Sequence, residues 1–338
     1  MLRCVLIVGL GSIGRRHARI VRALYPSVKL IALRHQRDYT ESLENGLGVD
    51  CQVYSISEAV DCSPDIAIIA NPASFHIDVA LPLAKAGIHL LVEKPIAADT
   101  KKIQQLLDCC KKNNCLVMVA YNLRFLPSLG YLQDCLRRNT IGNILSVRIE
   151  AGQNLRSWRP GINYRNSVSA QKVLGGGVLR ELSHELDYLL WMFGEVAWVS
   201  AYLSKQSNLE IDVEDTAHLL LGFMKDGRQK TLVASVNIDF IRYDPTRRCT
   251  VIGESGSLVW DGIEGSVNLY TEKHGEIKLF SDKPERNYTY REELRHFVDC
   301  VENERHPLIA AEDGLLVLQV IEAAQCSAEK GGCQVWVR

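Results

Sequence analysis

The sequence predicts two domains: an α/β domain with a parallel sheet, then an α+β domain with a large, mostly antiparallel open sheet. The chain has 338 residues, more than one ordinary compact core accommodates. Hydrophobic residues make up 47% and charged residues 23%, as in globular proteins. Strand-length apolar runs alternate with helical patterns until about Tyr121, where the rhythm changes. We therefore expect domains at residues 1–122 and 123–338.

The first domain should hold a parallel sheet with helices on both faces. Its expected strands are Cys4–Val8, Lys29–Leu33, Ile66–Ala70, Ile88–Val92 and Leu116–Ala120. Its expected helices include Ser12–Tyr25, Ser74–Ala86 and Thr100–Lys112.

The second domain opens with an expected helix, Pro127–Arg138, and a longer strand, Ile144–Ala151. A polar, aromatic loop then runs from Gln153 to Gln171, and one helix follows the glycines at 175–177. Further expected strands are Ala197–Leu203, Thr216–Phe223, Lys230–Ile238, Arg248–Ile252 and Ser257–Trp260, with a hairpin turn at 225–228. Two helices, near Tyr290–Glu302 and Glu312–Glu329, end the chain.

Composition argues against several classes of protein. Lys plus Arg number 39 against 40 Asp plus Glu, so the basic excess of a nucleic-acid binder is missing. The sequence has neither a bilayer-length apolar stretch nor a signal-peptide cleavage pattern, so we expect no membrane association. Eleven cysteines with irregular spacing and no Cys-x-x-Cys predict reduced thiols in the cytoplasm rather than disulfides or zinc.

The stretch "VLIVGLGSIGRRHARIV" contains the pattern Gly9-x-Gly11-x-x-Gly14 between a strand and a helix. This context is typical of a dinucleotide-binding turn, although a purely structural turn is the alternative. One glycine permits the tight turn, the next the approach of the pyrophosphate, and the third close helix–strand packing. Free N–H groups at the helix start suit phosphates, so Ser12 and Ile13 join the expected contacts.

The end of the second strand, "KLIALRHQRD", predicts which cofactor binds. Arg34, His35 and Arg37 stand where an acid would bind the adenosine ribose of NAD. Cations at this place suit a 2′-phosphate, so NADP(H) is favoured and NAD(H) remains the alternative. The charges could also be solvated surface groups.

The run "LLVEKPIAADT" places Lys94 at the exit of a buried strand, between Glu93 and Pro95. Ligands bind beyond the carboxyl ends of parallel strands, so Lys94 should face the nicotinamide and steady a developing alkoxide. Glu93 would fix its position; the alternative is an ordinary surface lysine. Three further residues at strand exits and one on the helix after them complete the expected cofactor contacts: Asn71, Pro72, Asn122 and His76.

These segments resemble the Gfo/Idh/MocA family, the relatives of glucose–fructose oxidoreductase and inositol dehydrogenase. The resemblance rests on "AGIHLLVEKPIA", "NPASFH", "YNLRFLP", "GGGVLRELSHELDYLLWMFGEV", "EDTAHLLLGF", "VIGESGSLVWDG" and "ELRHFVDCV". It implies an N-terminal Rossmann domain and a C-terminal domain with a broad open sheet, with the substrate between that sheet and the nicotinamide. It also suggests a cis bond between Lys94 and Pro95.

Glu181, His184 and Asp187 follow the glycines at i, i+3 and i+6 of one expected helix. A histidine between carboxylates can accept a hydroxyl proton, and His184 matches the family's catalytic histidine. Relatives commonly carry aspartate one turn earlier, where this chain has Glu181. A structural histidine or a metal site are the alternatives, and we expect no metal.

The loop "NLRSWRPGINYRNSVSAQ" is rich in side chains that stack on sugars and bind anions. We expect substrate contacts from Arg156, Trp158, Arg159, Tyr164 and Arg165, and from Arg124 upstream. An anionic substrate such as a sugar acid or nucleotide sugar would suit the arginines; a surface loop or subunit contact is the alternative.

Together these features predict an NAD(P)-dependent oxidoreductase that interconverts a secondary alcohol and a ketone on a sugar, sugar derivative, nucleotide sugar or cyclitol. Lys94 would polarise the oxygen and His184 would move the proton, assisted by Glu181 or Asp187. The alternatives are a non-catalytic nucleotide sensor and a glycoside-modifying enzyme that retains its cofactor through an internal redox cycle. An apolar open sheet face predicts a homodimer or homotetramer.

Overall fold

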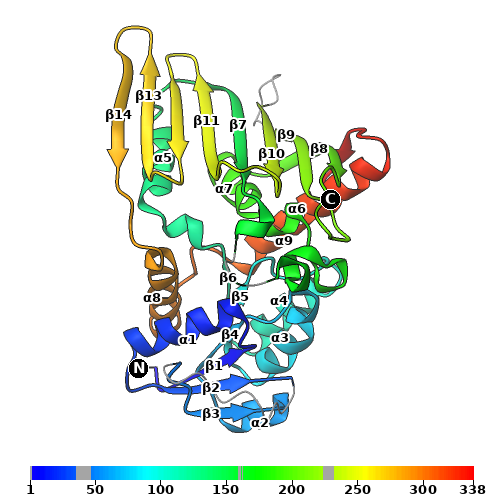
Figure 1. Cartoon of the computed structure of the whole chain (residues 1–338). Helices are drawn as coiled ribbons and strands as arrows, with labels where there is room; N and C mark the ends of the chain where they lie inside the picture. Colours follow the sequence, from blue (N-terminus) through cyan, green and yellow to red (C-terminus); the bar gives the residue numbers. More distant parts are fainter. Residues whose placement is uncertain (1, 36–46, 159–160, 162, 224–231) are drawn as a thin grey trace. The chain divides into compact units, whose positions relative to one another are not determined.

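The computed structural model describes residues 2–35, 47–158, 161, 163–223 and 232–338 (Figure 1). Packing divides the chain into two compact units. The first comprises Met1–Asn122 and Asn287–Leu318, and the second Leu123–Arg286 and Gln319–Arg338. Sequence reasoning placed all of 123–338 in one domain, whereas Asn287–Leu318 packs with the first unit.

The sheet of the first unit has six parallel strands in the order β3-β2-β1-β4-β5-β6. All but the outer strand β3 are apolar and almost wholly buried, as a sheet covered on both faces requires. The strand order reverses at β1, which creates the switch point where such sheets bind ligands. The strands are β1 (Cys4–Val8), β2 (Lys29–Leu33), β3 (Cys51–Val53), β4 (Ile66–Ile69), β5 (His89–Glu93) and β6 (Val117–Ala120).

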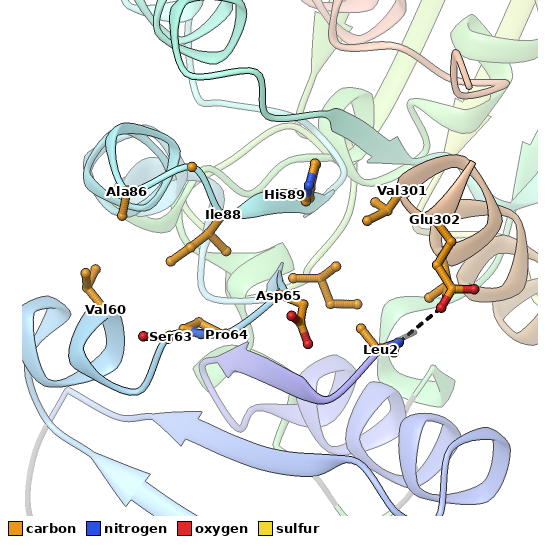
Figure 2. A pocket seen from close by; sticks show the side chains of 13 residues that line it. Leu2, Val60, Ser63, Pro64, Asp65, Ala86, Ile88, His89, Val301 and Glu302 are labelled. Carbon is orange, nitrogen blue, oxygen red and sulfur yellow. Dashed lines mark hydrogen bonds between the residues drawn. The ribbon is translucent and has the colours of Figure 1, made fainter. Parts of the chain in front are cut away.

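Helices of this unit include one that comes from late in the sequence. The N–H of Leu2, just before β1, donates to Glu302 Oε1 at 3.0 Å, which ties helix α8 to the sheet (Figure 2). This contact is one reason why α8 belongs to the first unit. The helices are α1 (Ser12–Leu24), α2 (Ile56–Asp61), α3 (His76–Lys85), α4 (Ile103–Lys112), α8 (Tyr288–Glu302) and the start of α9 (Ala311–Glu329).

A cavity of about 590 Å³ lies at the amino ends of β4 and β5. Figure 2 shows Asp65, His89 and Glu302 around it, with apolar side chains between them. Lys94 follows the opposite, carboxyl end of β5. The cavity is therefore separate from the edge at which open parallel sheets bind ligands.

The second unit contains a nine-stranded sheet in the order β14-β13-β12-β11-β7-β10-β9-β8-β15. Among the pairings of described strands, β10 with β7 is parallel and the others are antiparallel. The strands are β7 (Ile144–Gly152), β8 (Val196–Ser204), β9 (Thr216–Phe223), β10 (Leu232–Asp239), β11 (Thr246–Gly253), β12 (Ser257–Asp261), β13 (Ser266–Thr271), β14 (Gly275–Ser281) and β15 (Val335–Trp336). The expected fold class is thus confirmed, although β3, α2, β13, β14 and β15 escaped sequence reasoning.

Helices cover one face of this sheet: α5 (Pro127–Arg137), α6 (Val178–Glu181), α7 (His184–Phe193) and the rest of α9 (Figure 1). Strand β10 shows the resulting alternation, because Ala234, Val236 and Ile238 are buried while Asn237 is exposed. The expected hairpin turn at 225–228 lies outside the described residues. Within the part of the chain that is described, no helix combines the length and apolarity needed to cross a membrane.

Candidate functional site

The glycine turn after β1 has the geometry of a dinucleotide cradle. Gly9 has φ +85°, and a Cβ there would lie 3.1 Å from the backbone of Asn71. A Cβ at Gly14 would overlap the carbonyl oxygen of Gly9, so helix and turn pack too closely for a side chain. At Gly11, by contrast, a Cβ would meet nothing within 4 Å. The turn is therefore closed on its protein side and open where a pyrophosphate would approach.

Helix α1 begins next to this opening without a side-chain cap at its N-cap residue, Gly11. Its first N–H groups, which include those of Ser12 and Ile13, are the donors that a helix start offers to phosphate. The residues present thus fit the dinucleotide that the sequence predicts.

The strand register places the other expected residues along the same edge. Val8 pairs with Ile69, and Ile69 with Val92, in parallel strands. The segments that follow these strands carry Gly9, Asn71 and Lys94, and they leave the sheet at its carboxyl edge. Lys94 therefore follows β5 at the edge where open parallel sheets bind ligands.

Arg34 and His35 follow β2 at this edge. The Arg34 side chain is half-buried and donates to Gln52 Oε1 at 3.4 Å, whereas His35 is exposed. The expected contact from Arg37 lies outside the described residues. One arginine and one histidine, and no acid, therefore occupy the described end of β2.

The bond between Lys94 and Pro95 is cis, which confirms the expectation from the family resemblance. The Glu93 carboxylate does more than flank Lys94. Its Oε1 lies 2.7 Å from His17 Nε2 of α1, and its Oε2 accepts the Lys94 N–H at 3.3 Å. His17 is fully buried and Glu93 is 8% exposed. The pair thus joins helix α1 to the segment that follows β5.

The His76 side chain also contacts groups inside the protein rather than solvent. It is 1% exposed, with Nε2 at 2.8 Å from the Asn71 carbonyl and Nδ1 at 3.1 Å from the Pro95 carbonyl. Burial lowers its pKa, although both carbonyls oppose that shift. His76 therefore holds the segment after β4, with Pro72, against the segment after β5. The structure thus gives His76 a supporting role at two strand exits, and its expected cofactor contact stays a prediction.

Asn122 follows β6 but directs its amide into the core. The side chain is 6% exposed, and its Nδ2 donates to Thr289 Oγ1 of α8 at 2.8 Å. This bond ties the segment after β6 to α8, and the expected cofactor contact of Asn122 stays a prediction.

The segment that bears His184 is not one continuous helix. Helix α6 ends at Glu181 and α7 begins at His184, with Leu182 and Ser183 between them. Hydrogen bonds here span three residues, as from Glu185 N–H to the Leu182 carbonyl at 3.2 Å. Ser183 keeps helical backbone angles, and its side chain forms no capping bond at the start of α7. The prediction of a single helix was therefore wrong at this point, and the i, i+3, i+6 spacing does not lie on one regular surface.

Glu214 fixes the start of α6. Its Oε1 accepts the Leu179 N–H at 3.1 Å, and its carbonyl accepts the Val178 N–H at 3.2 Å. A Cβ at Gly177, where φ is +109°, would overlap the carboxylate. Burial raises the pKa of Glu214. Sequence reasoning missed this residue, and the only signal was its place in "EDTAHLLLGF".

The neighbouring Gly176 joins the same turn to the predicted substrate loop. Its N–H donates to the Gln171 carbonyl at 3.0 Å, and the Gly177 N–H donates to the Ser169 carbonyl at 3.2 Å. A Cβ at Gly176 would overlap the Val168 carbonyl. The glycines thus allow the loop to pack directly against the segment that leads to His184.

Arg124 and Asp187 form a buried ion pair with each other. Arg124 Nη2 lies 2.7 Å from Asp187 Oδ1, and the two side chains are 2% and 0% exposed. The guanidinium also lies 5.5 Å from the centre of the Trp191 ring. Arg124 is thus enclosed and bonded to Asp187, while the expected roles of Arg124 in substrate binding and of Asp187 in catalysis stay predictions. His184 and Glu181 are half-buried.

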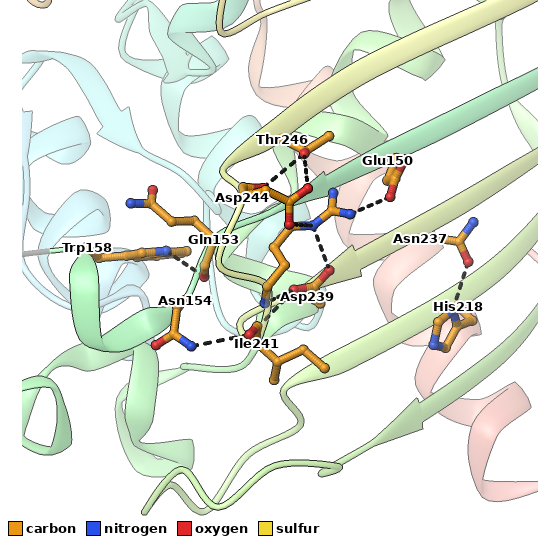
Figure 3. Close-up of polar contacts among 11 residues, drawn as sticks. Glu150, Gln153, Asn154, Trp158, His218, Asn237, Asp239, Ile241, Asp244 and Thr246 are labelled. Carbon is orange, nitrogen blue, oxygen red and sulfur yellow. Dashed lines mark hydrogen bonds and ion pairs between the residues drawn. The ribbon is translucent and has the colours of Figure 1, made fainter.

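The base of the substrate loop is fixed to the turn after β10, as Figure 3 shows. Asn154 Nδ2 donates to the Ile241 carbonyl at 3.2 Å, and the Trp158 Nε1–H donates to the Gln153 carbonyl at 2.9 Å. The Trp158 ring packs edge-on against Phe240, with ring centres 5.0 Å apart. Trp158 therefore helps to hold the base of the loop in place.

Three expected substrate residues gather farther along the loop. The guanidinium groups of Arg156 and Arg165 lie 6.0 and 5.9 Å from the centre of the Tyr164 ring. Arg165 forms an ion pair with Glu210. The Tyr164 hydroxyl accepts the Glu210 N–H at 3.3 Å, and this bond lowers its pKa, with smaller contributions from the two arginines. Arg159 lies outside the described residues.

Among the described residues, no group of three or more His, Cys, Asp or Glu side chains could hold a metal ion.

Comparison with known proteins agrees with this geometry. Residues 3–121 match the family model for the NAD-binding Rossmann fold of an oxidoreductase family, and residues 133–337 match its C-terminal alpha/beta domain. The chain is 24% identical over 335 residues to myo-inositol 2-dehydrogenase of Thermotoga maritima, covering 96% of each. It is also 24% identical over 340 residues to scyllo-inositol 2-dehydrogenase (NAD(+)) of Bacillus subtilis, covering 98% of this chain and 95% of the relative.

A solved structure of levoglucosan dehydrogenase in complex with NADH superimposes with a TM-score of 0.87 over 99% of both chains, at 21% identity. At this identity the likeness concerns the fold. The two family models, however, cover nearly the whole chain, so the protein belongs to the Gfo/Idh/MocA oxidoreductase family, as its motifs predicted.

Proposed function

We propose that the protein transfers hydride between a nicotinamide cofactor and a CH–OH carbon of a sugar, sugar derivative, nucleotide sugar or cyclitol. The observation that carries this proposal is the turn with open space at Gly11, on the same sheet edge as Lys94. The names of relatives support the substrate class, since two are inositol dehydrogenases and another is a glucose-6-phosphate 3-dehydrogenase.

In this proposal Lys94 donates a hydrogen bond to the substrate oxygen and stabilises the alkoxide that develops there. His184 accepts the hydroxyl proton on its imidazole and returns it in the reverse direction. When bound, the nicotinamide supplies a two-electron hydride acceptor or donor. The residue one turn before the histidine is Glu181, and we assign it to orienting that imidazole. The buried pair of Arg124 and Asp187 supports the rest of α7.

We further propose NADP(H) as the preferred cofactor. Arg34 and His35 offer positive charge or hydrogen-bond donors at the described end of β2. A 2′-phosphate accepts such contacts, whereas a ribose diol is usually bound by an acid. NAD(H) is the competing cofactor, and neighbouring folds have been solved with NAD and NADH.

For the substrate, we propose an anionic group bound near Arg156. The charge of Arg165 is compensated by Glu210, so the loop's remaining cation among these residues is the Arg156 guanidinium beside Tyr164. The Tyr164 ring offers an apolar surface of the kind that stacks on sugars. Arg156→Ala should raise KM for a sugar acid or sugar phosphate more than for the uncharged sugar.

We also propose that the protein forms a homodimer or homotetramer in the cytoplasm. Large apolar side chains stay exposed on the strands of the second unit, including Tyr202 at 59% and Leu220 at 46%. All eleven cysteines are free thiols, which suits a reducing compartment. Light scattering of the purified protein measures the oligomeric state directly.

The decisive experiment is a panel of sugars, sugar acids, nucleotide sugars and inositols with both cofactors, followed by absorbance of the reduced nicotinamide. Single-turnover hydride transfer is then measured in Lys94→Ala, His184→Ala and the double variant. Each single change should slow transfer by roughly 10²–10⁴-fold, and the double variant by less than the product. Lys85→Ala and His274→Ala, at exposed positions, are the matched controls.

Cofactor binding is measured separately in every variant. Near-parental rates in His184→Ala would make the histidine structural. Binding of cofactor with no turnover on any substrate would favour a nucleotide sensor. Cofactor that remains bound through purification and is regenerated at each turnover would favour the internal redox cycle.

A further inference from the structure

Helix α4 ends in a turn that brings two cysteines together. The Asn113 N–H donates to the Cys109 carbonyl and the Cys115 N–H to the Cys110 carbonyl, each at 3.0 Å. Between them Asn114 is left-handed, with φ 51°. This is the pattern of a Schellman cap, in which the side chains of the residues at positions 110 and 115 meet across the turn. In most proteins that contact is apolar, and here both residues are cysteine.

The turn holds the two thiols beside each other, and Cys115 Sγ lies 3.7 Å from the Ala84 carbonyl, to which it donates. Cys110 is 6% and Cys115 8% exposed. Interaction with Cys115 and burial raise the pKa of Cys110, whereas interaction with Cys110 lowers the pKa of Cys115. Cys115 is therefore the thiol of this pair that loses its proton more readily.

We propose that Cys110 and Cys115 are an oxidisable dithiol, which closes into an intramolecular disulfide when the protein meets a hydroperoxide. The Cys115 thiolate attacks the peroxide oxygen, the O–O bond breaks, and Cys115 becomes a sulfenic acid, while the departing alkoxide or hydroxide takes up the proton that the Cys115 thiol released. The Cys110 sulfur then attacks Cys115, the S–O bond breaks, and the departing hydroxide takes the Cys110 proton to leave as water. Two thiols are oxidised by two electrons in total, and one hydroperoxide is reduced to an alcohol, or to water, plus a further water.

The turn that brings Cys110 and Cys115 together makes this site different from the chain's other buried thiols. A buried cysteine is ordinarily inert because an oxidant reaches it slowly and no partner is near. Here a small peroxide needs to reach only one sulfur, because the turn already holds the partner beside it. The other close pair, Cys4 and Cys62, differs: the Cys4 thiol lies 4.0 Å from the Cys62 carbonyl.

The test treats the full-length protein with graded hydrogen peroxide, blocks the remaining thiols by alkylation and maps the unreduced tryptic peptides by mass spectrometry. Trypsin cuts after Lys111 and Lys112, so the proposed bond joins peptide 103–111 to peptide 113–124. A bond between Cys109 and Cys110 would instead stay within one peptide. The joined pair should be the first disulfide to appear and should disappear on treatment with a dithiol reductant.

Three variants locate the bond and the attacking sulfur. Cys109→Ser is the matched control and should keep the joined peptides at the parental yield. Cys110→Ser should lose them and leave a sulfenic acid at Cys115 that reacts with dimedone. Cys115→Ala should lose them with little adduct at Cys110. Circular dichroism of each variant checks that the fold is retained.

The proposal is overturned if peroxide oxidises the exposed Cys333 to its sulfinic acid before any 103–111 to 113–124 pair forms. It is also overturned if Cys109→Ser abolishes the pair, because Cys109 would then be the partner. These outcomes are read in the parent and in a variant at a partly exposed position, so they do not depend on whether the buried variants fold.

Discussion

The contact between His17 and Glu93 should stabilise the first unit measurably. Leucine at position 17 has nearly the size of histidine but cannot bond the Glu93 carboxylate, which is 2.7 Å from His17 Nε2 and 8% exposed. Leaving a buried acceptor unsatisfied costs about 1–3 kcal/mol, and more if it is charged. His17→Leu should therefore lower the free energy of unfolding by at least that amount. Replacing both partners by apolar residues should cost less than the sum of the single changes.

The assay is a double-mutant cycle of His17→Leu, Glu93→Leu and the double variant, followed by urea unfolding. All five tryptophans lie in the second unit, so their fluorescence reports that unit, whereas far-UV circular dichroism reports both. The circular dichroism transition should shift while the fluorescence transition stays in place. His17→Gln, which retains a donor, is the control. Costs that add within ~0.3–0.5 kcal/mol would refute the coupling between the two side chains.

The remaining predictions concern the cofactor and the histidine segment. Arg34→Ala should weaken NADPH binding roughly tenfold or more, because a charge-assisted bond contributes ~1.5–3 kcal/mol, and leave NADH nearly unchanged in titrations of both cofactors; equal weakening would contradict a role in reading the 2′-phosphate. Gly11→Ala should leave thermal stability near parental but weaken cofactor binding, whereas Gly14→Ala should lower the melting temperature, because its Cβ would overlap the Gly9 carbonyl. Burial raises the pKa of Glu214 in the folded protein, so the protonated carboxyl group favours the folded state. This stabilisation is fully present below the pKa of the unfolded chain and is lost as pH rises through the pKa of the folded protein. Glu214→Gln should remove that loss, and parallel stability–pH curves for parent and variant would contradict the assignment.

Local pattern determined much of the first unit. Continuous apolar runs identified the strands from Cys4–Val8 onward, because a strand buried on both faces has few alternatives to apolar side chains. The glycine spacing identified the turn after β1, because the backbone around Gly9 and Gly14 leaves too little room for a side chain. The direction of the strand alone predicted that Lys94 follows its carboxyl end, at the edge where parallel sheets bind ligands.

The second unit shows where pattern reasoning fails. Edge strands such as β14 are largely exposed, so their sequence lacks the apolar alternation that marks a strand. The interruption at Leu182 and Ser183 was hidden because apolar periodicity continues across it. Local backbone hydrogen bonds decide such breaks, and they depend on neighbours that the sequence does not place.

Only the tertiary structure decided which polar side chains bond with each other. The sequence identified Arg124, Asp187 and His76 as chemically capable, and the fold committed each to a buried partner. Residues such as His17 and Glu214 became visible only through the groups they contact. The physical reason is that a polar group taken out of water must find a partner, and that partner is often more than sixty residues away in the chain, as Glu93 is from His17.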